Sequence, residues 1–179
     1  MVGTVSELSP TDVRDLRRQL VELYDTALDD VYGYLARRCE SVTAAEELTS
    51  ETFLAAADAV VHRPPVDLTV AWLIGIARHK LGDHWRRRER ERRLLTAIDA
   101  QPGSNDDVWD VELDRITAHA VLRRLGPHHR GALTLRYVDG LPVREVAACL
   151  GRTEKATEVL LVRARAAFRV EYESQGGRP

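Results

Sequence analysis

The chain has 179 residues, of which 44% are hydrophobic and 6% aromatic, enough apolar material for one domain or two small ones. Its 26 basic and 28 acidic side chains give a formal net charge of −2, which excludes a uniformly basic or acidic protein. The N-terminus shows no signal peptide, and no run reaches the roughly 18 apolar residues that a membrane span needs. The sequence therefore predicts a cytoplasmic protein without a membrane span.

Two helices are predicted before the first pair of prolines. Apolar side chains recur every three or four positions over 12–38, which is the period of an amphipathic helix. A second helix over 43–60 starts at Thr43 with T-A-A-E, the pattern of a capping box. Pro64-Pro65 then predicts an irregular loop, because proline lacks a backbone donor and restricts the residue before it.

A third predicted helix carries the densest positive charge in the chain. It starts near Asp67 or Thr69 and runs through the arginines of 86–93, where six arginines face two glutamates for a net charge of +4. Pairs at i, i+3 or i+4 on a helix contribute only about 0.2–0.5 kcal/mol each, and two glutamates neutralise two arginines. Self-pairing therefore leaves four positive charges, which favours a nucleic-acid surface over a solvated helix face.

The composition changes after this helix. Residues 96–114 contain six acidic side chains and no lysine or arginine, and A-Q-P-G-S-N-D-D within them has no apolar periodicity. The sequence therefore predicts an acidic, flexible linker over 96–112. Its charge would repel stray nucleic acid, or would only keep a tether solvated.

The region after the linker predicts helices over 113–125 and 128–138, followed by a helix-turn-helix. Pro142 suits the first turn of one helix, and Gly151 suits the turn that ends it. Thr153 can cap a final helix to about residue 171. The first residues of such a helix reach base edges in the major groove and its later arginines meet phosphates; the alternative is a helical hairpin with a charged exterior.

The sequence offers little for catalysis. Cys39 and Cys149 are far apart and form no CxxC, so both are expected to be buried apolar side chains. His79 and Asp83 stand four residues apart, but no third ligand follows at metal spacing. There is no glycine-rich phosphate loop, nucleophile elbow or pair of catalytic carboxylates. We therefore predict no metal, no cofactor, no catalytic residue and no enzymatic activity.

Three stretches resemble bacterial RNA polymerase sigma factors of the sigma-70 family. L-R-R-L-G-P-H-H-R-G-A-L-T-L-R-Y-V-D-G-L-P-V-R-E-V-A-A-C-L-G-R-T resembles region 4, the C-terminal promoter-binding region. A-E-E-L-T-S-E-T-F-L-A-A and A-W-L-I-G-I-A-R-H-K-L-G-D-H-W-R-R-R resemble region 2. Regions 2 and 4 alone, joined by a short linker, are typical of the extracytoplasmic-function (ECF) group. The resemblance implies an all-α fold of two small helical domains, a region 2-type bundle over 12–95 and a region 4-type helix-turn-helix over 113–172.

The resemblance also implies a function and its partners. The chain would bind core RNA polymerase, recognise and melt promoter DNA and start transcription, under the control of an anti-sigma factor. Helix 43–60 corresponds to the surface that docks on the polymerase clamp coiled coil, and the C-terminal domain would meet the polymerase flap. The polymerase contacts implied are Glu46, Glu47, Leu48, Thr49, Glu51, Thr52 and Phe53. Glutamates in the first turn of a helix also complement its dipole, which is the simpler explanation of that face.

The DNA contacts implied fall into two groups. Those for the −10 element are His62, Arg63, Asp67, Arg78, His79, Asp83, Arg86, Arg87 and Arg90. Those for the −35 element are Arg152, Thr153, Glu154, Lys155, Thr157, Glu158, Arg163 and Arg165. Two features depart from the family pattern: Pro64-Pro65 in the loop that would hold a flipped −10 base, and Glu158-Val159-Leu160 where Lys-Ser-Arg is commoner.

A second class of protein remains open at this stage. An ordinary helix-turn-helix regulator with a helical sensing domain over 12–95 would bind duplex promoter DNA without polymerase. A ligand sensor should enclose a pocket in its first domain, whereas a sigma region 2 should expose the face of helix 43–60.

Overall fold

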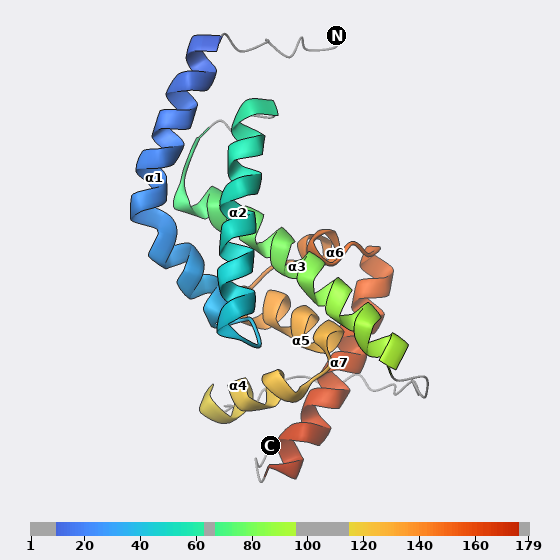
Figure 1. The fold of residues 1–179 in the computed structure, drawn as a ribbon. Helices are drawn as coiled ribbons and strands as arrows, with labels where there is room; N and C mark the ends of the chain where they lie inside the picture. The colour runs from blue at the N-terminus through green and yellow to red at the C-terminus, as the bar shows by residue number, and fades with distance from the viewer. Residues whose placement is uncertain (1–9, 63–66, 96–114, 176–179) are drawn as a thin grey trace, which may run out of the picture. The chain divides into compact units, whose positions relative to one another are not determined.

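The computed structural model describes residues 10–62, 67–95 and 115–175, and all regular secondary structure in these ranges is helical (Figure 1). The predicted all-α fold is therefore confirmed. The chain divides into two compact units, Met1–Leu81 and Gly82–Pro179. Arg63, Pro64-Pro65 and the linker predicted over 96–112 lie outside the described residues.

In the first unit, α1 (Pro10–Ala36) packs along α2 (Val42–His62), and the unit also contains the start of α3 (Val70–Leu95) (Figure 1). Its most deeply buried apolar side chains are small or aliphatic, among them Ala27, Val31, Leu35, Ala45, Leu48, Ala56, Val60, Leu73, Ala77 and Leu81. The rings of Tyr24 and Phe53 meet edge to face with centroids 4.6 Å apart. Such an aromatic pair adds about 0.5–1.5 kcal/mol beyond the area that it buries.

Side-chain caps fix the starts of α2 and α3. The hydroxyl oxygen of Ser41 accepts a hydrogen bond from the amide of Ala44 at 3.1 Å. Ser41 is thus the cap of α2, and the prediction that Thr43 begins a capping box is wrong, because α2 starts one residue earlier, at Val42. Thr69 caps α3, because its hydroxyl accepts from the amide of Trp72 at 3.2 Å, and the helix starts close to the predicted position near Asp67 or Thr69.

The second unit contains the rest of α3 together with α4 (Arg115–Arg124), α5 (Pro127–Leu133), η1 (Thr134–Val138), α6 (Val143–Leu150) and α7 (Glu154–Ser174). The predicted helix over 128–138 is therefore an α-helix that ends in a π-helical turn. Pro142 stands just before α6 as its N-cap rather than inside its first turn, with an extended ψ of 155°. Its missing N–H is harmless there as well.

The helix-turn-helix has the predicted local chemistry. Gly151 ends α6 in the left-handed region, at φ 58°, where glycine meets no steric penalty. Thr153 then caps α7, because its hydroxyl oxygen accepts from the amide of Ala156 at 3.2 Å. The side chains of Val146, Leu150, Leu161 and Phe168 are buried between the helices.

Trp85 of α3 belongs to the core of the second unit. Its side chain is fully buried, and a Cβ added to Gly131 of α5 would come within 2.6 Å of the indole ring. A Cβ on Gly82 would collide with the backbone carbonyl of Cys149. Both glycines thus permit close approach of α3 to α5 and α6. Cys39 and Cys149 are both buried, as predicted.

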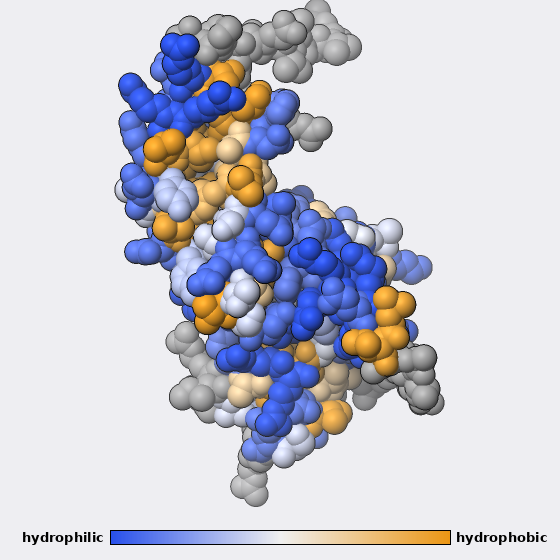
Figure 2. Space-filling view, in the orientation of Figure 1, coloured by the Kyte–Doolittle hydropathy of each residue, from blue (hydrophilic) through white to orange (hydrophobic). Residues whose placement is uncertain are grey.

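The surface of the second half of α3 is strongly hydrophilic, and an apolar cluster marks its end (Figure 2). That cluster is formed by Leu94 and Leu95, which are 85% and 87% exposed. Within the part of the chain that the structure describes, no helix is both long enough and apolar enough to cross a bilayer.

Candidate functional site

The outer face of α2 is acidic. Glu46 and Glu47 are exposed, whereas Leu48, which the resemblance also implies as a polymerase contact, is only 1% exposed and belongs to the core. Thr49 and Thr52 are corrections, because they are 6% and 0% exposed and cannot present a polar surface. Their hydroxyls donate to the carbonyl oxygens of Ala45 and Leu48 at 2.7 Å each, so the helix itself satisfies them.

Two further α2 residues have partners inside the first unit. Glu51 forms an ion pair with Lys80 of α3 at 3.6 Å, and Phe53 is half-buried against Tyr24. The exposed face continues instead through Leu54, 71% exposed, and residues that the sequence analysis missed, Ser50 and Asp58. The signal was present in the helical spacing, because Ser50 lies four positions after Glu46, Leu54 four after Ser50 and Asp58 four after Leu54.

The predicted −10 residues of the first unit are spread along its surface. His62 ends α2 and contacts Asp58, with 3.0 Å between its Nδ1 and the carboxylate. Asp67 and His79 are exposed, and Arg78 is half-buried. Arg63 lies outside the described residues. His62 is thus held by its own helix, and His79 points to solvent from α3.

The second half of α3 carries the other predicted −10 residues. Asp83, Arg87 and Arg90 are exposed on one side of this helix, at i, i+4 and i+7 spacing. Arg86 differs from them, because its guanidinium pairs with Asp83 and donates to the carbonyl oxygen of Cys149 at 2.8 Å. The structure therefore leaves Arg87 and Arg90 as the exposed cations of this face and engages Arg86 inside the unit.

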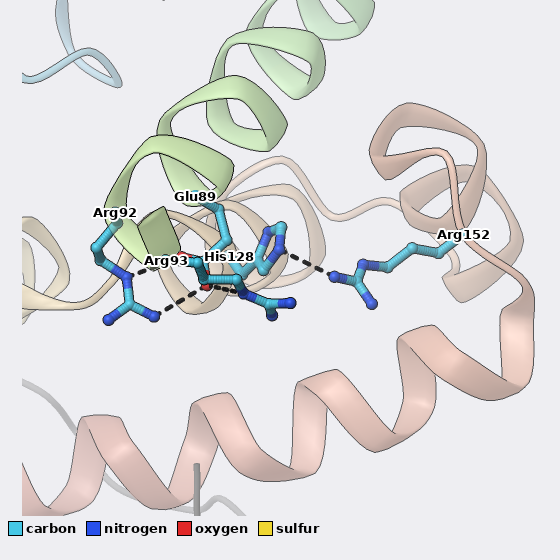
Figure 3. A network of polar contacts seen from close by, with 5 residues as sticks. All are labelled: Glu89, Arg92, Arg93, His128 and Arg152. Carbon is cyan, nitrogen blue, oxygen red and sulfur yellow. Dashed lines mark hydrogen bonds and ion pairs between the residues drawn. The ribbon is translucent and has the colours of Figure 1, made fainter. Parts of the chain in front are cut away.

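Glu89 is the buried acid among the arginines of α3 (Figure 3). Its side chain is 3% exposed, and its Oε1 accepts from Arg92 Nη2 at 2.9 Å and from Arg93 Nε at 2.8 Å. Burial would raise the pKa of this carboxyl, but the hydrogen bonds from the two arginines outweigh it and lower the pKa to about 2. Glu89 is thus ionised and fixes the end of α3.

His128 of α5 lies beside this acid and contacts Arg152 of the turn (Figure 3). Its Nε2 is 3.0 Å from Nη2 of Arg152. Because arginine can only donate, Nε2 accepts and the imidazole is neutral with its proton on Nδ1. Burial lowers the pKa of His128 to about 4, although the charge of Glu89 opposes the shift. Arg152, a predicted −35 contact, is thus held within the unit here.

The predicted −35 residues of α7 fall into three groups. Lys155, Glu158 and Arg163 are exposed, as is Glu154. Thr157 is a correction, because it is fully buried and its hydroxyl donates to the carbonyl oxygen of Thr153 at 3.0 Å. Arg165 donates to the hydroxyl of Tyr137 at 3.2 Å, and the hydroxyl of Thr153 caps α7. Both side chains therefore make hydrogen bonds within the second unit.

One groove of about 1030 Å³ runs beside α7 within the second unit. Its cations come from α3, α4, the turn and α7: Arg92, Arg93, Arg124, Arg152, Lys155 and Arg163. Its apolar lining is contributed by Leu125, Ala156, Val159, Leu160, Ala167 and Val170. Two acids, Glu89 and Glu171, also line it. The cations of the groove suit a ligand that carries several negative charges, and its apolar lining suits a ligand that also carries apolar groups.

A capped helix that follows a glycine turn and exposes cations defines the class of helix-turn-helix DNA-binding proteins. Residues 23–91 match the model of sigma-70 region 2, and residues 116–168 match that of sigma-70 region 4. The chain therefore belongs to the sigma-70 family, and its region 2 and region 4 layout is that of an ECF-type factor.

Two curated relatives agree with this assignment. The chain is 34% identical over 148 residues to the ECF RNA polymerase sigma factor BldN of Streptomyces coelicolor, covering 79% of this chain and 56% of BldN. It is 27% identical over 159 residues to the ECF RNA polymerase sigma factor SigM of Bacillus subtilis, covering 84% of this chain and 93% of SigM. The chain thus spans little more than half the length of BldN and nearly all of SigM.

A solved structure shares the fold. The sigma factor RpoE of Bartonella quintana, crystallised with the anti-sigma factor NepR, aligns over 89% of this chain and 98% of its own, with a TM-score of 0.52 and 19% identity.

Proposed function

We propose that this chain is an ECF sigma factor that binds core RNA polymerase, recognises a promoter at two elements and opens the DNA for initiation. The observation that carries the proposal is the order of region 2 and region 4 in one chain, each with an exposed polar helix face. The chain supplies recognition and strand separation, and the polymerase supplies the chemistry, so this protein is not itself an enzyme.

The acidic face of α2 is the proposed polymerase contact. Glu46 and Glu47 form its start, and Leu54 supplies an exposed apolar side chain two turns further on. Interface cores combine an apolar anchor with a polar rim, which this face offers. Thr49 and Thr52 support the helix from inside and make no contact with the partner.

The exposed side of α3 is the proposed −10 surface. His79, Asp83, Arg87 and Arg90 stand on one side of a single helix, with the cations towards its end. Each arginine that meets a phosphate releases counterions and strengthens binding at low salt. Polar side chains along the same face would contact the bases of the melted strand.

The first two turns of α7 are the proposed −35 reader. Lys155, Glu158 and Arg163 are exposed on the helix that follows the glycine turn. In this motif the recognition helix enters the major groove with its N-terminal residues at base edges. Arg163 lies a further turn along, where phosphate contacts position the helix.

Control by an anti-sigma factor is part of the proposal. Members of the ECF group are commonly held inactive by a dedicated inhibitor that covers their polymerase and promoter surfaces. The acidic face of α2 and the basic groove beside α7 are the surfaces that such a partner would cover here. This proposal places the chain in the cytoplasm, where polymerase and promoter are.

Core binding tests the proposal against the alternative of an independent helix-turn-helix regulator. The wild-type chain and a Glu46→Lys/Glu47→Lys variant are titrated against core RNA polymerase, with Glu173→Lys as the matched control, because Glu173 is an exposed glutamate of α7. We expect tight binding by the wild type and the control and at least about tenfold weaker binding by the double variant. A wild-type chain that binds promoter duplex but not core polymerase would establish the regulator instead.

A further inference from the structure

The outward side of α7 carries exposed apolar residues in its first two turns, which is unexpected for a helix proposed to bind a polyanion. Thr157, Leu160, Leu161, Ala164 and Phe168 are buried and define the inward side. Successive residues are about 100° apart around an α-helix, which places Lys155 and Val159 near the centre of the opposite side. Val159 is 46% exposed there, and Ala156 beside it is also exposed.

Local stability does not account for this valine. At an exposed position of a helix, valine is a poorer helix former than alanine, lysine or glutamate. Val159 does not complete the core either, because the neighbouring Leu160 and Leu161 are 8% and 5% exposed and already fill it. An exposed β-branched residue at the centre of a recognition face therefore points to contact with a ligand.

The chemistry of the major groove identifies what an apolar side chain can recognise there. Guanine, adenine and cytosine are recognised in that groove through hydrogen-bonding groups, and thymine alone presents a methyl group there, at C5. Valine or alanine placed against guanine or cytosine would bury a donor or acceptor without a partner, which is unfavourable. Placed against a thymine methyl, the same side chain gains from the removal of apolar surface from water.

The charges on either side of Val159 are also consistent with this side of α7 facing the DNA. Lys155 precedes Val159 by one turn on the same side, and Arg163 follows it by one turn. The pair of cations brackets the apolar patch formed by Ala156 and Val159. Phosphate contacts from such cations hold a helix in register while the residues between them meet the bases.

We propose that Ala156 and Val159 read the methyl groups of thymines in the −35 duplex, so that this chain prefers thymine at the positions that the patch covers. This inference rests on the proposed function, and it goes beyond it by assigning a base preference to two residues outside the predicted contacts. It also gives a role to Glu158-Val159-Leu160, which departs from the commoner Lys-Ser-Arg pattern: an apolar side chain contacts the bases where a polar one is commoner.

The test uses the full chain with core RNA polymerase of the source organism. Duplexes randomised upstream of the start site are selected by the holoenzyme, and each thymine of the selected −35 element is then replaced singly by deoxyuridine. Burial of one methyl group corresponds to about a fourfold change in affinity. We expect about a fourfold loss at one or two thymines and no change at the others.

A variant and a matched control assign the effect to the side chain. Val159→Ser should bind the thymine and deoxyuridine duplexes equally well, whereas Val170→Ser should retain the discrimination. Val170 is a suitable control because it is 69% exposed on the same side of α7, three turns further along. Both variants change exposed residues, and an unchanged melting temperature checks that they fold.

The outcomes separate this inference from the proposed function. If the holoenzyme selects a −35 element but deoxyuridine has no effect, or if Val159→Ser keeps the discrimination, the inference is overturned and the sigma assignment stands. The same holds if Val159→Ser weakens binding of a protein partner and leaves DNA affinity unchanged. If the wild-type chain neither binds core polymerase nor selects any sequence, the proposed function itself fails.

Discussion

Arg86 of α3 donates a hydrogen bond to the carbonyl oxygen of Cys149, the next-to-last residue of α6, at 2.8 Å. The last carbonyls of a helix have no partner within the helix and need an outside donor. Arg86 supplies that donor, and its guanidinium also lies beside Gly151 at the turn. A residue expected to contact promoter DNA is therefore, in this structure, a cap of the helix-turn-helix.

This relationship predicts different effects for two neighbouring arginines. Arg86→Ala should lower the free energy of unfolding by about 1.5–3 kcal/mol, because a hydrogen bond to a charged group is lost. Arg87→Ala should leave stability within about 0.5 kcal/mol of the wild type and reduce the slope of log affinity against log salt by about 0.7–0.9. Urea denaturation and DNA titration at several salt concentrations measure the two effects. Equal stabilities of the two variants would contradict the capping role of Arg86.

The contact between Trp85 and Gly131 predicts an unfavourable alanine substitution. A Cβ at Gly131 would lie 2.6 Å from the buried indole, so Gly131→Ala should destabilise the chain by about 1–3 kcal/mol through overpacking. Gly75→Ala is the matched control, since a Cβ at that helical glycine meets nothing within 4 Å. The control should gain up to about 1 kcal/mol from helix propensity. Urea denaturation of both variants decides, and a Gly131→Ala variant as stable as the control would rule out the contact.

The glutamates of the arginine run should differ in importance. Glu89 is 3% exposed and bound by two arginines, whereas Glu91 is 50% exposed and paired with Arg88 at 3.3 Å. Glu89→Gln should cost about 1–3 kcal/mol because a charged, buried acceptor is lost. Glu91→Gln should cost at most about 0.5 kcal/mol, as is usual for an exposed pair on a helix. Thermal unfolding of the two variants compares them, and the opposite ranking would contradict the buried network.

The neutral state of His128 predicts a pH dependence of stability. Its pKa is lowered from 6.5 to about 4 in the folded chain, so between these values the unfolded state binds more protons. Stability should therefore fall as the pH drops from 6.5 towards 4. Burial also lowers the pKa of His129, which adds a contribution of the same sign.

The variant His128→Gln isolates the first histidine. Glutamine can still accept from Arg152 but does not titrate, so the variant should lose less stability than the wild type between pH 7 and pH 5. Glu89 does not interfere in this interval, because the loss of its contribution begins only as the pH falls through 4.5 towards 2. Urea denaturation at both pH values measures the difference. Identical losses for the two proteins would show that His128 is not held neutral.

The helices and their ends were largely predictable from the sequence because their signals are local. The cap at Thr153, the cap at Thr69 and the left-handed turn at Gly151 each depend on residues within one turn of the chain. The start of α2 was misplaced at Thr43 because Ser41 offers the same hydroxyl chemistry two residues earlier.

The errors in the candidate site have a common physical cause. Thr49, Thr52 and Thr157 were predicted as polar contacts, but each hydroxyl donates to a carbonyl oxygen one turn back and is buried. A threonine whose hydroxyl is hydrogen-bonded to the backbone of its own helix has the same spacing in the sequence as an exposed threonine. Only the packing of neighbouring helices distinguishes the two.

The burial of Trp85 and Glu89 depends on residues distant in the sequence. Glu89 lies within a run of arginines whose composition indicates solvent exposure, yet it is 3% exposed. Trp85 is covered because Gly131, some 45 positions later, has no side chain. The periodicity of α3 alone carries no information about the distant residues that bury Trp85 and Glu89.

In vitro transcription tests the central claim most directly. Core RNA polymerase with and without this full chain is given fragmented genomic DNA of the source organism, and the 5′ ends of the transcripts are mapped. A sigma factor predicts new start sites that depend on the chain and share two sequence elements upstream, near −35 and −10. The same 5′ ends with and without the chain would contradict the account.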